Sequence, residues 1–152
     1  MDTSPHPQWP QEGSSSLPEF QRYLIQEFEY LFGNPQNVAD VRNVLSWLKD
    51  DPSRFFSWGD RDSFSTLFLP FHLGDPHIKK WIDACEVPDR LLSFMKTCTL
   101  LEKTTDQFAY LSDSAELEHK EEIIRALEEL LRLLPTREEF VRLVEDIRLT
   151  RV

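Results

Sequence analysis

Glycine, cysteine and long apolar runs are scarce in this chain of 152 residues, and each scarcity excludes a class of protein. Four glycines are too few for the tight hairpins of an all-β fold or for a glycine-rich phosphate-binding loop. Two cysteines cannot build a disulfide scaffold. No window approaches the roughly 18 consecutive apolar residues of a membrane span. The chain is nevertheless long enough to bury a core of its own.

The first 16 residues lack the basic segment and the following apolar run of a secretory signal. They are rich in proline and serine, which predicts a disordered, flexible tail. Residues 17–152 are expected to form a single all-helical domain. With two reduced thiols and no signal, we expect an intracellular protein, and the sequence does not distinguish cytoplasm from nucleus.

The charge of the chain is strongly negative, at −10 overall, and it is unevenly distributed. Residues 106–152 hold twelve acidic against seven basic side chains. Such a surface repels phosphate backbones, and no dense basic cluster occurs, so we do not expect direct binding of nucleic acid. A partner protein with a basic surface is compatible with it. The alternative is that the charge serves solubility alone.

Apolar residues recur with helical spacing along most of the chain, and no stretch alternates with the period of two that marks a strand. Asn34-Pro35, Asp51-Pro52 and Asp75-Pro76 each combine a helix cap with a first-turn proline. Thr136 and Glu139 have the spacing of a capping box. The sequence therefore predicts an all-α protein, a compact multi-helix bundle or short helical array of about seven helices. The expected helices cover residues 18–32, 35–49, 51–58, 62–69, 76–85, 89–104, 113–134 and a last one from 136.

The helix expected over residues 113–134 is the most regular. Its main apolar stripe comprises Leu117, Ile124, Leu127, Leu131 and Leu134, and Ile123 and Leu130 widen it. A stripe of this width can serve two neighbours, so homo-oligomerisation through residues 113–134 is one hypothesis. Glu121 with Arg125 and Glu128 with Arg132 have the spacing of favourable ion pairs.

Aromatic side chains concentrate in residues 53–74, which hold five of the eleven phenylalanines together with Trp58. So much aromatic surface belongs either in the core or in a docking surface. We expect Phe64, Phe68 and Phe71 to form the buried part, and Phe56 and Trp58 to form any exposed part. The candidate partner-binding residues are Trp47, Phe55, Phe56, Trp58, Arg61, Phe64 and Phe68.

The residues that most often carry chemistry do not form a recognisable site. His72, His77, Cys85 and Cys98 lack the paired short spacings of a structural zinc site. Cys85 is expected at a helix end beside acidic residues and Cys98 among apolar ones, and both settings favour the neutral, unreactive thiol. We therefore predict no catalytic residue, no cofactor and no metal site.

Two functions fit these features. The preferred one is a non-enzymatic protein–protein interaction module, an adaptor or complex subunit, that uses an aromatic groove and an acidic C-terminal face. The alternative is a helical bundle with an internal apolar pocket for a small molecule or lipid, with or without catalysis. In that pocket His72, Asp75 and His77 are the expected polar groups.

Overall fold

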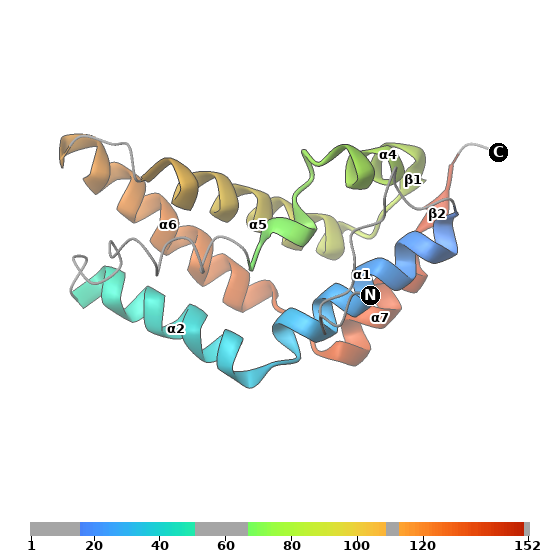
Figure 1. Ribbon diagram of the computed structural model, residues 1–152, viewed down its shortest axis with the longest axis horizontal. Coiled ribbons are helices and arrows are strands. Elements are labelled where there is room, and N and C mark those ends of the chain that lie inside the picture. The colour runs from blue at the N-terminus through green and yellow to red at the C-terminus, as the bar shows by residue number, and fades with distance from the viewer. Residues whose placement is uncertain (1–15, 51–66, 109–112, 151–152) are drawn as a thin grey trace, which may run out of the picture.

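The computed structural model describes residues 16–50, 67–108 and 113–150. Within these ranges it has six α-helices, one 3-10 helix and two short strands (Figure 1). The α-helices are α1 (Leu17–Phe32), α2 (Pro35–Asp50), α4 (Pro76–Ala84), α5 (Asp89–Phe108), α6 (Asp113–Leu133) and α7 (Arg137–Glu145). The all-α fold is therefore confirmed. The predicted tail, apart from Ser16, and the predicted helix over residues 51–58 lie outside the described residues.

Short polar side chains begin the helices at the positions that the sequence predicts. Asn34 before α2 and Asp75 before α4 each accept a hydrogen bond from the backbone N–H two residues ahead, at 2.9 Å in both cases. Thr136 and Glu139 form the complete capping box at the start of α7. Because these caps satisfy N–H groups that have no partner in the helix, they fix the points at which the chain enters each helix.

The chain near Pro70 differs from the prediction. We expected Pro70 to end a helix and Phe71 to begin an irregular exit. Instead, Leu69–Phe71 forms a 3-10 helix, η2, with Pro70 inside it. Proline is tolerated in the first turn of a helix because its missing N–H would have no partner there. The N–H of Phe71 closes the turn on the carbonyl of Phe68 (3.2 Å).

Phenylalanine rings form the centre of the core. Phe28 stacks on Phe140 with ring centroids 4.0 Å apart. Phe94 meets Phe71 edge-on at 5.5 Å and Phe32 edge-on at 5.8 Å. These five buried rings come from α1, η2, α5 and α7, so one aromatic cluster joins four elements that are distant in sequence. Edge-to-face and stacked rings contribute about 0.5–1.5 kcal/mol per pair beyond the area that they bury.

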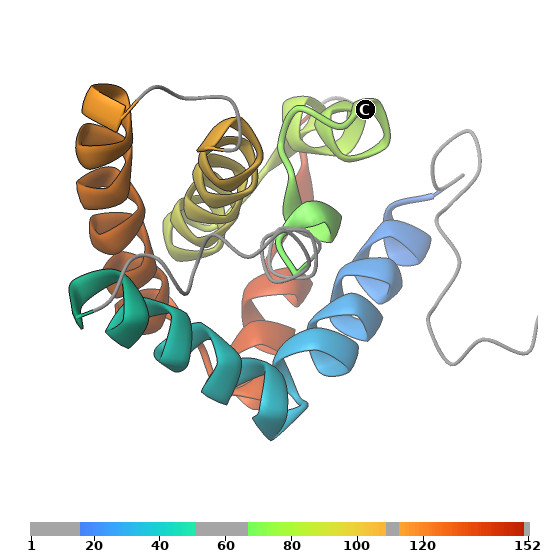
Figure 2. The same cartoon turned by 60° about the vertical axis from the view of Figure 1, so that its left-hand side comes forward.

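Helix α6 lies between two helices of the same chain. It runs beside α5 over much of its length, and α2 packs on its other side, while α1 packs on α7 (Figures 1 and 2). Ile123, Leu127 and Leu130 are fully buried, whereas Ile124 and Leu131, which we placed on the main stripe, are only partly buried. The wide apolar stripe therefore has two neighbours within the chain itself.

Both predicted ion pairs of α6 are wrong. Glu121 and Arg125 do not pair with each other in the described residues. Glu128 does not pair with Arg132; its carboxylate lies 3.2 Å from Lys49 Nζ on α2. Arg132 instead donates to Glu129, three residues before it (Nε to Oε2, 3.1 Å). The packing of α2 beside α6 brings a lysine to Glu128, which helical spacing alone does not reveal.

A small antiparallel sheet joins two distant segments. β1 (Cys85–Glu86) pairs with β2 (Arg148–Leu149), with Cys85 opposite Leu149. We expected Cys85 to be the end of a helix and did not predict a strand. Two-residue strands are too short to show a period of two, so the sequence gives no local signal for them. The pairing holds the residues after α7 against the end of α4.

Of the helices that the structure describes, none combines the length and the apolar character needed to cross a membrane.

Candidate interaction surface between helices α5 and α6

Most of the predicted aromatic groove lies outside the described residues. This applies to Phe55, Phe56, Trp58, Arg61 and Phe64. Trp47 belongs to α2, and its side chain is also outside the described part. Their assignment to a partner-binding groove stays a prediction.

The C-terminal part of the aromatic stretch is described, and it belongs to the core. Phe68 and Phe71 both have an exposed fraction of 0%. Their predicted burial is confirmed. Leu69, between them, is 41% exposed, because the tight 3-10 turn directs it away from the core. Phe68 therefore offers no surface to a partner in this structure.

His72, one of the two histidines expected to line a pocket, holds the loop before α4 instead. His72 Nδ1 accepts a hydrogen bond from the N–H of Gly74 (2.9 Å), and His72 Nε2 lies 3.2 Å from Glu102 Oε2 on α5. The imidazole thus joins the loop to α5. Asp75 Oδ1 is occupied as the cap of α4, where it accepts from the backbone N–H of His77. These groups hold the local backbone.

Both cysteines are free thiols in environments that favour the neutral form. Burial raises the pKa of Cys98 well above its usual value, and partial burial raises that of Cys85. A thiolate is the nucleophilic form, so a raised pKa lowers the reactivity of both side chains at neutral pH. Within the described residues, no three metal-ligating side chains lie close enough together to hold an ion.

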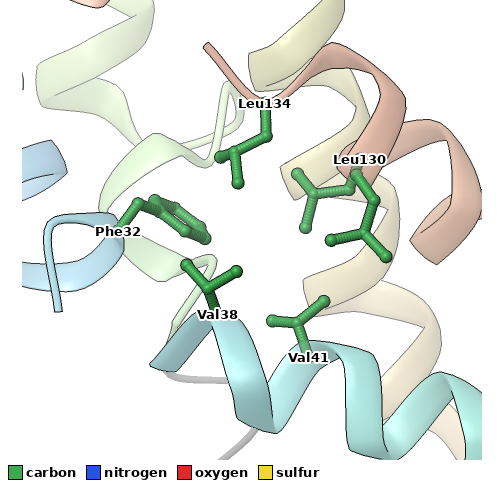
Figure 3. A pocket seen from close by; sticks show the side chains of 6 residues that line it. Phe32, Val38, Val41, Leu130 and Leu134 are labelled. Atoms are coloured by element: carbon green, nitrogen blue, oxygen red, sulfur yellow. The ribbon is translucent and has the colours of Figure 1, made fainter. Parts of the chain in front are cut away.

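One hollow between α2 and α6 is purely apolar. It is lined by Phe32, Val38, Val41, Leu130, Leu131 and Leu134, and their side chains point toward one another (Figure 3). It has no room for a water molecule. It is therefore a loosely filled part of the core, and a ligand would need the surrounding helices to move apart.

A second hollow opens to solvent on the outer side of the α5–α6 pair. It has a volume of about 370 Å³ and is lined by Thr97, Leu100, Glu122, Arg125, Ala126 and Glu129. Leu100 is 40% exposed, whereas Ala126 is 4% exposed. The small side chain of Ala126 leaves space where α5 and α6 meet. Neither this hollow nor the apolar one is lined by His72, Asp75 or His77.

The rim of this open hollow is charged. Lys96 and Lys103 are exposed on α5, one turn before and one turn after Leu100. On α6, Glu122 and Glu129 flank Ala126 with the same spacing. Arg125 also lines the hollow. An apolar centre with a charged rim has the composition of a protein-binding surface rather than that of a reaction site.

Helical patterns in the sequence did not predict this surface. The signal was present as two matched patterns: lysines four residues before and three after Leu100, and glutamates four before and three after Ala126. Helical periodicity alone does not find it, because Leu100 reads as one more apolar residue of α5. Comparison of the chain with protein-family models, with curated proteins and with solved structures finds no match.

Proposed function

We propose that this chain is a non-enzymatic protein–protein interaction module, an adaptor or complex subunit, whose partner carries a basic surface. The observation that carries the proposal is the acidic excess of the C-terminal third. Glu121, Glu138, Glu145 and Asp146 are all exposed, and none of them forms an ion pair with another residue that the structure describes. Unneutralised surface charge of one sign steers partners of the opposite sign.

The thiols support a non-enzymatic role, since their raised pKa values disfavour nucleophilic catalysis. Two free cysteines are also in keeping with a reducing, intracellular environment, which we infer for this protein. The aromatic groove predicted from residues 53–74 belongs to the same proposal as its apolar component.

The test compares two variants with equal changes in net charge. In the acid-neutralised variant, Glu121→Gln, Glu138→Gln, Glu145→Gln and Asp146→Asn raise the net charge by four. The matched control makes the same change at other exposed acids: Asp40→Asn, Asp50→Asn, Glu86→Gln and Asp89→Asn. Tagged full-length proteins are used to capture partners from lysate, with quantification by mass spectrometry. We expect the acid-neutralised variant to lose proteins with basic segments that the wild type and the control retain.

Equal losses in both variants would show that only total charge matters, and they would contradict an acidic binding face.

The aromatic groove is tested by a separate experiment. Phe56→Ala with Trp58→Ala should reduce capture of the same partner while the far-ultraviolet circular dichroism spectrum is unchanged. Unchanged capture by that folded double variant would remove the groove from the proposal.

A further inference from the structure

The outer side of the α5–α6 pair carries a projection and a hollow next to each other. The projection is Leu100 on α5, and the hollow of about 370 Å³ lies beside it over Ala126 of α6. A surface with both features can pair with a copy of itself, because a two-fold axis places each projection over the other copy's hollow. This is the arrangement by which knobs enter holes in coiled coils.

The charges around the two features are complementary. On α5, Lys96 and Lys103 flank Leu100 at the −4 and +3 positions. On α6, Glu122 and Glu129 flank Ala126 at the same two positions. Residues three and four apart lie on one face of a helix. Each central residue is therefore flanked, one turn away on either side, by two side chains that carry the same charge as each other. The basic edge lies on one helix and the acidic edge on the other.

We propose that two copies of this chain associate through this α5–α6 face. A two-fold axis parallel to the helix pair brings α5 of one copy over α6 of the second copy. Leu100 then enters the hollow over Ala126 of the second copy. Because α5 and α6 run in opposite directions (Figure 1), the lysines of one copy meet the glutamates of the second copy in reverse order. Lys103 then approaches Glu122, and Lys96 approaches Glu129, with each contact made twice. This inference goes beyond the proposed function and uses other residues than the acids assigned to the basic partner.

Three features of the molecule oppose the association and limit its strength. Glu129 already accepts a hydrogen bond from Arg132 Nε of its own helix (3.1 Å), so Lys96 of the second copy must share that carboxylate. Each copy carries a net charge of −10, although repulsion between exposed charges is largely screened beyond about 8 Å at physiological salt. Arg125 lines the hollow and faces the incoming lysines. The apolar contact is centred on one leucine per copy, so we expect a dissociation constant on the order of 10 µM. Arg125→Gln should lower that constant several-fold.

Sedimentation velocity of the full chain at concentrations from about 2 to 200 µM tests the association. Wild-type protein should shift from monomer to dimer over this range, and Leu100→Ser should remain monomeric at the highest concentration. Two charge-reversed proteins provide the specific test: Lys96→Glu with Lys103→Glu, and Glu122→Lys with Glu129→Lys. Each alone places like charges opposite each other in both contacts and should be monomeric. Mixed in equal amounts, they restore opposite charges in both contacts and should form a heterodimer.

Three results would overturn the proposal. One is a wild-type protein that stays monomeric at 200 µM. Another is a dimer that persists in Leu100→Ser and in both charge-reversed proteins, because another surface must then mediate it. The third is a mixture of the two charge-reversed proteins that stays monomeric although each keeps the wild-type circular dichroism spectrum. Partner capture by the acid-neutralised variant is measured separately, so failure of either proposal leaves the other testable.

Discussion

Gly74 lies where a side chain would collide with the imidazole of His72. A Cβ added at Gly74 would come within 2.7 Å of His72 Cε1 and 3.0 Å of Nδ1. The ring is fixed in this place by its two contacts, one with the N–H of Gly74 and one with Glu102 on α5. The requirement for glycine here is therefore one of space beside a positioned ring.

Gly74→Ala should consequently destabilise the protein by about 1–2 kcal/mol, the usual cost of forcing extra volume into a packed site. The cause can be isolated by a double-mutant cycle with His72→Ala, measured by urea denaturation. With the ring removed, the same glycine substitution should cost at least about 0.5 kcal/mol less. Equal costs in the two backgrounds would mean that the imidazole is not what excludes a side chain at residue 74.

At the scale of single elements, one site of incomplete packing lies between α2 and α6. Val38 and Val41 of α2 face Leu130 across a narrow apolar hollow that has no room for water (Figure 3). Atoms that border such a space lose dispersion contacts and gain no hydration in exchange. A slightly larger side chain at this point should therefore stabilise the protein.

We expect Val38→Ile to raise the free energy of unfolding by about 0.5–1 kcal/mol, as cavity-filling substitutions commonly do. Valine and isoleucine are both β-branched, so helix propensity changes little. Val44→Ile is the matched control on the same helix: Val44 is 5% exposed and does not line the hollow, so overpacking should make this change neutral or destabilising. The free energy of unfolding of the wild type and the two variants is measured by urea denaturation. Equal effects at both positions would contradict the assignment of the loose packing to this hollow.

The elements also show how far the sequence can predict this fold. Helix starts were predictable at Asn34, Asp75 and Thr136, because a cap and its N–H partners lie within three residues of each other. The ion pair of Glu128 with Lys49 was not predictable, because only the packing of α2 on α6 brings the two side chains together. Sequence patterns report on contacts within a turn or two of the chain, and contacts between distant elements depend on how helices dock.

The candidate surface shows the same limit. The spacing of charges around Leu100 and around Ala126 is visible in the sequence, but nothing in it says that the two patterns lie side by side. Only the packing of α5 on α6 brings the centres of the two patterns, Leu100 and Ala126, to one hollow. The strand pair formed by Cys85–Glu86 and Arg148–Leu149 was missed for the same reason, since about sixty residues separate its two halves.

At the scale of the whole molecule, two electrostatic effects of opposite sign act on stability. In the part of the chain that the structure describes, three exposed ion pairs join different helices: Lys49 with Glu128, Arg90 with Glu139, and Arg137 with Glu29. Each contributes about 0–1 kcal/mol, and added salt weakens it. The net charge of −10 has the opposite effect, because repulsion between the negative side chains destabilises the folded protein. Added salt weakens this repulsion.

We expect the repulsion to dominate, because the net charge of −10 is large and the three pairs are exposed and therefore weak. Raising sodium chloride from about 10 to 150 mM should therefore increase the melting temperature by about 2–4 °C, equivalent to roughly 1 kcal/mol for a chain of this size. Thermal unfolding followed by circular dichroism at about 2 µM protein keeps most of the chains monomeric, because this concentration lies below the dissociation constant expected for the dimer. The acid-neutralised variant, with a net charge four units less negative, should show a smaller increase. A melting temperature that falls with salt would instead show that the ion pairs between helices outweigh the repulsion.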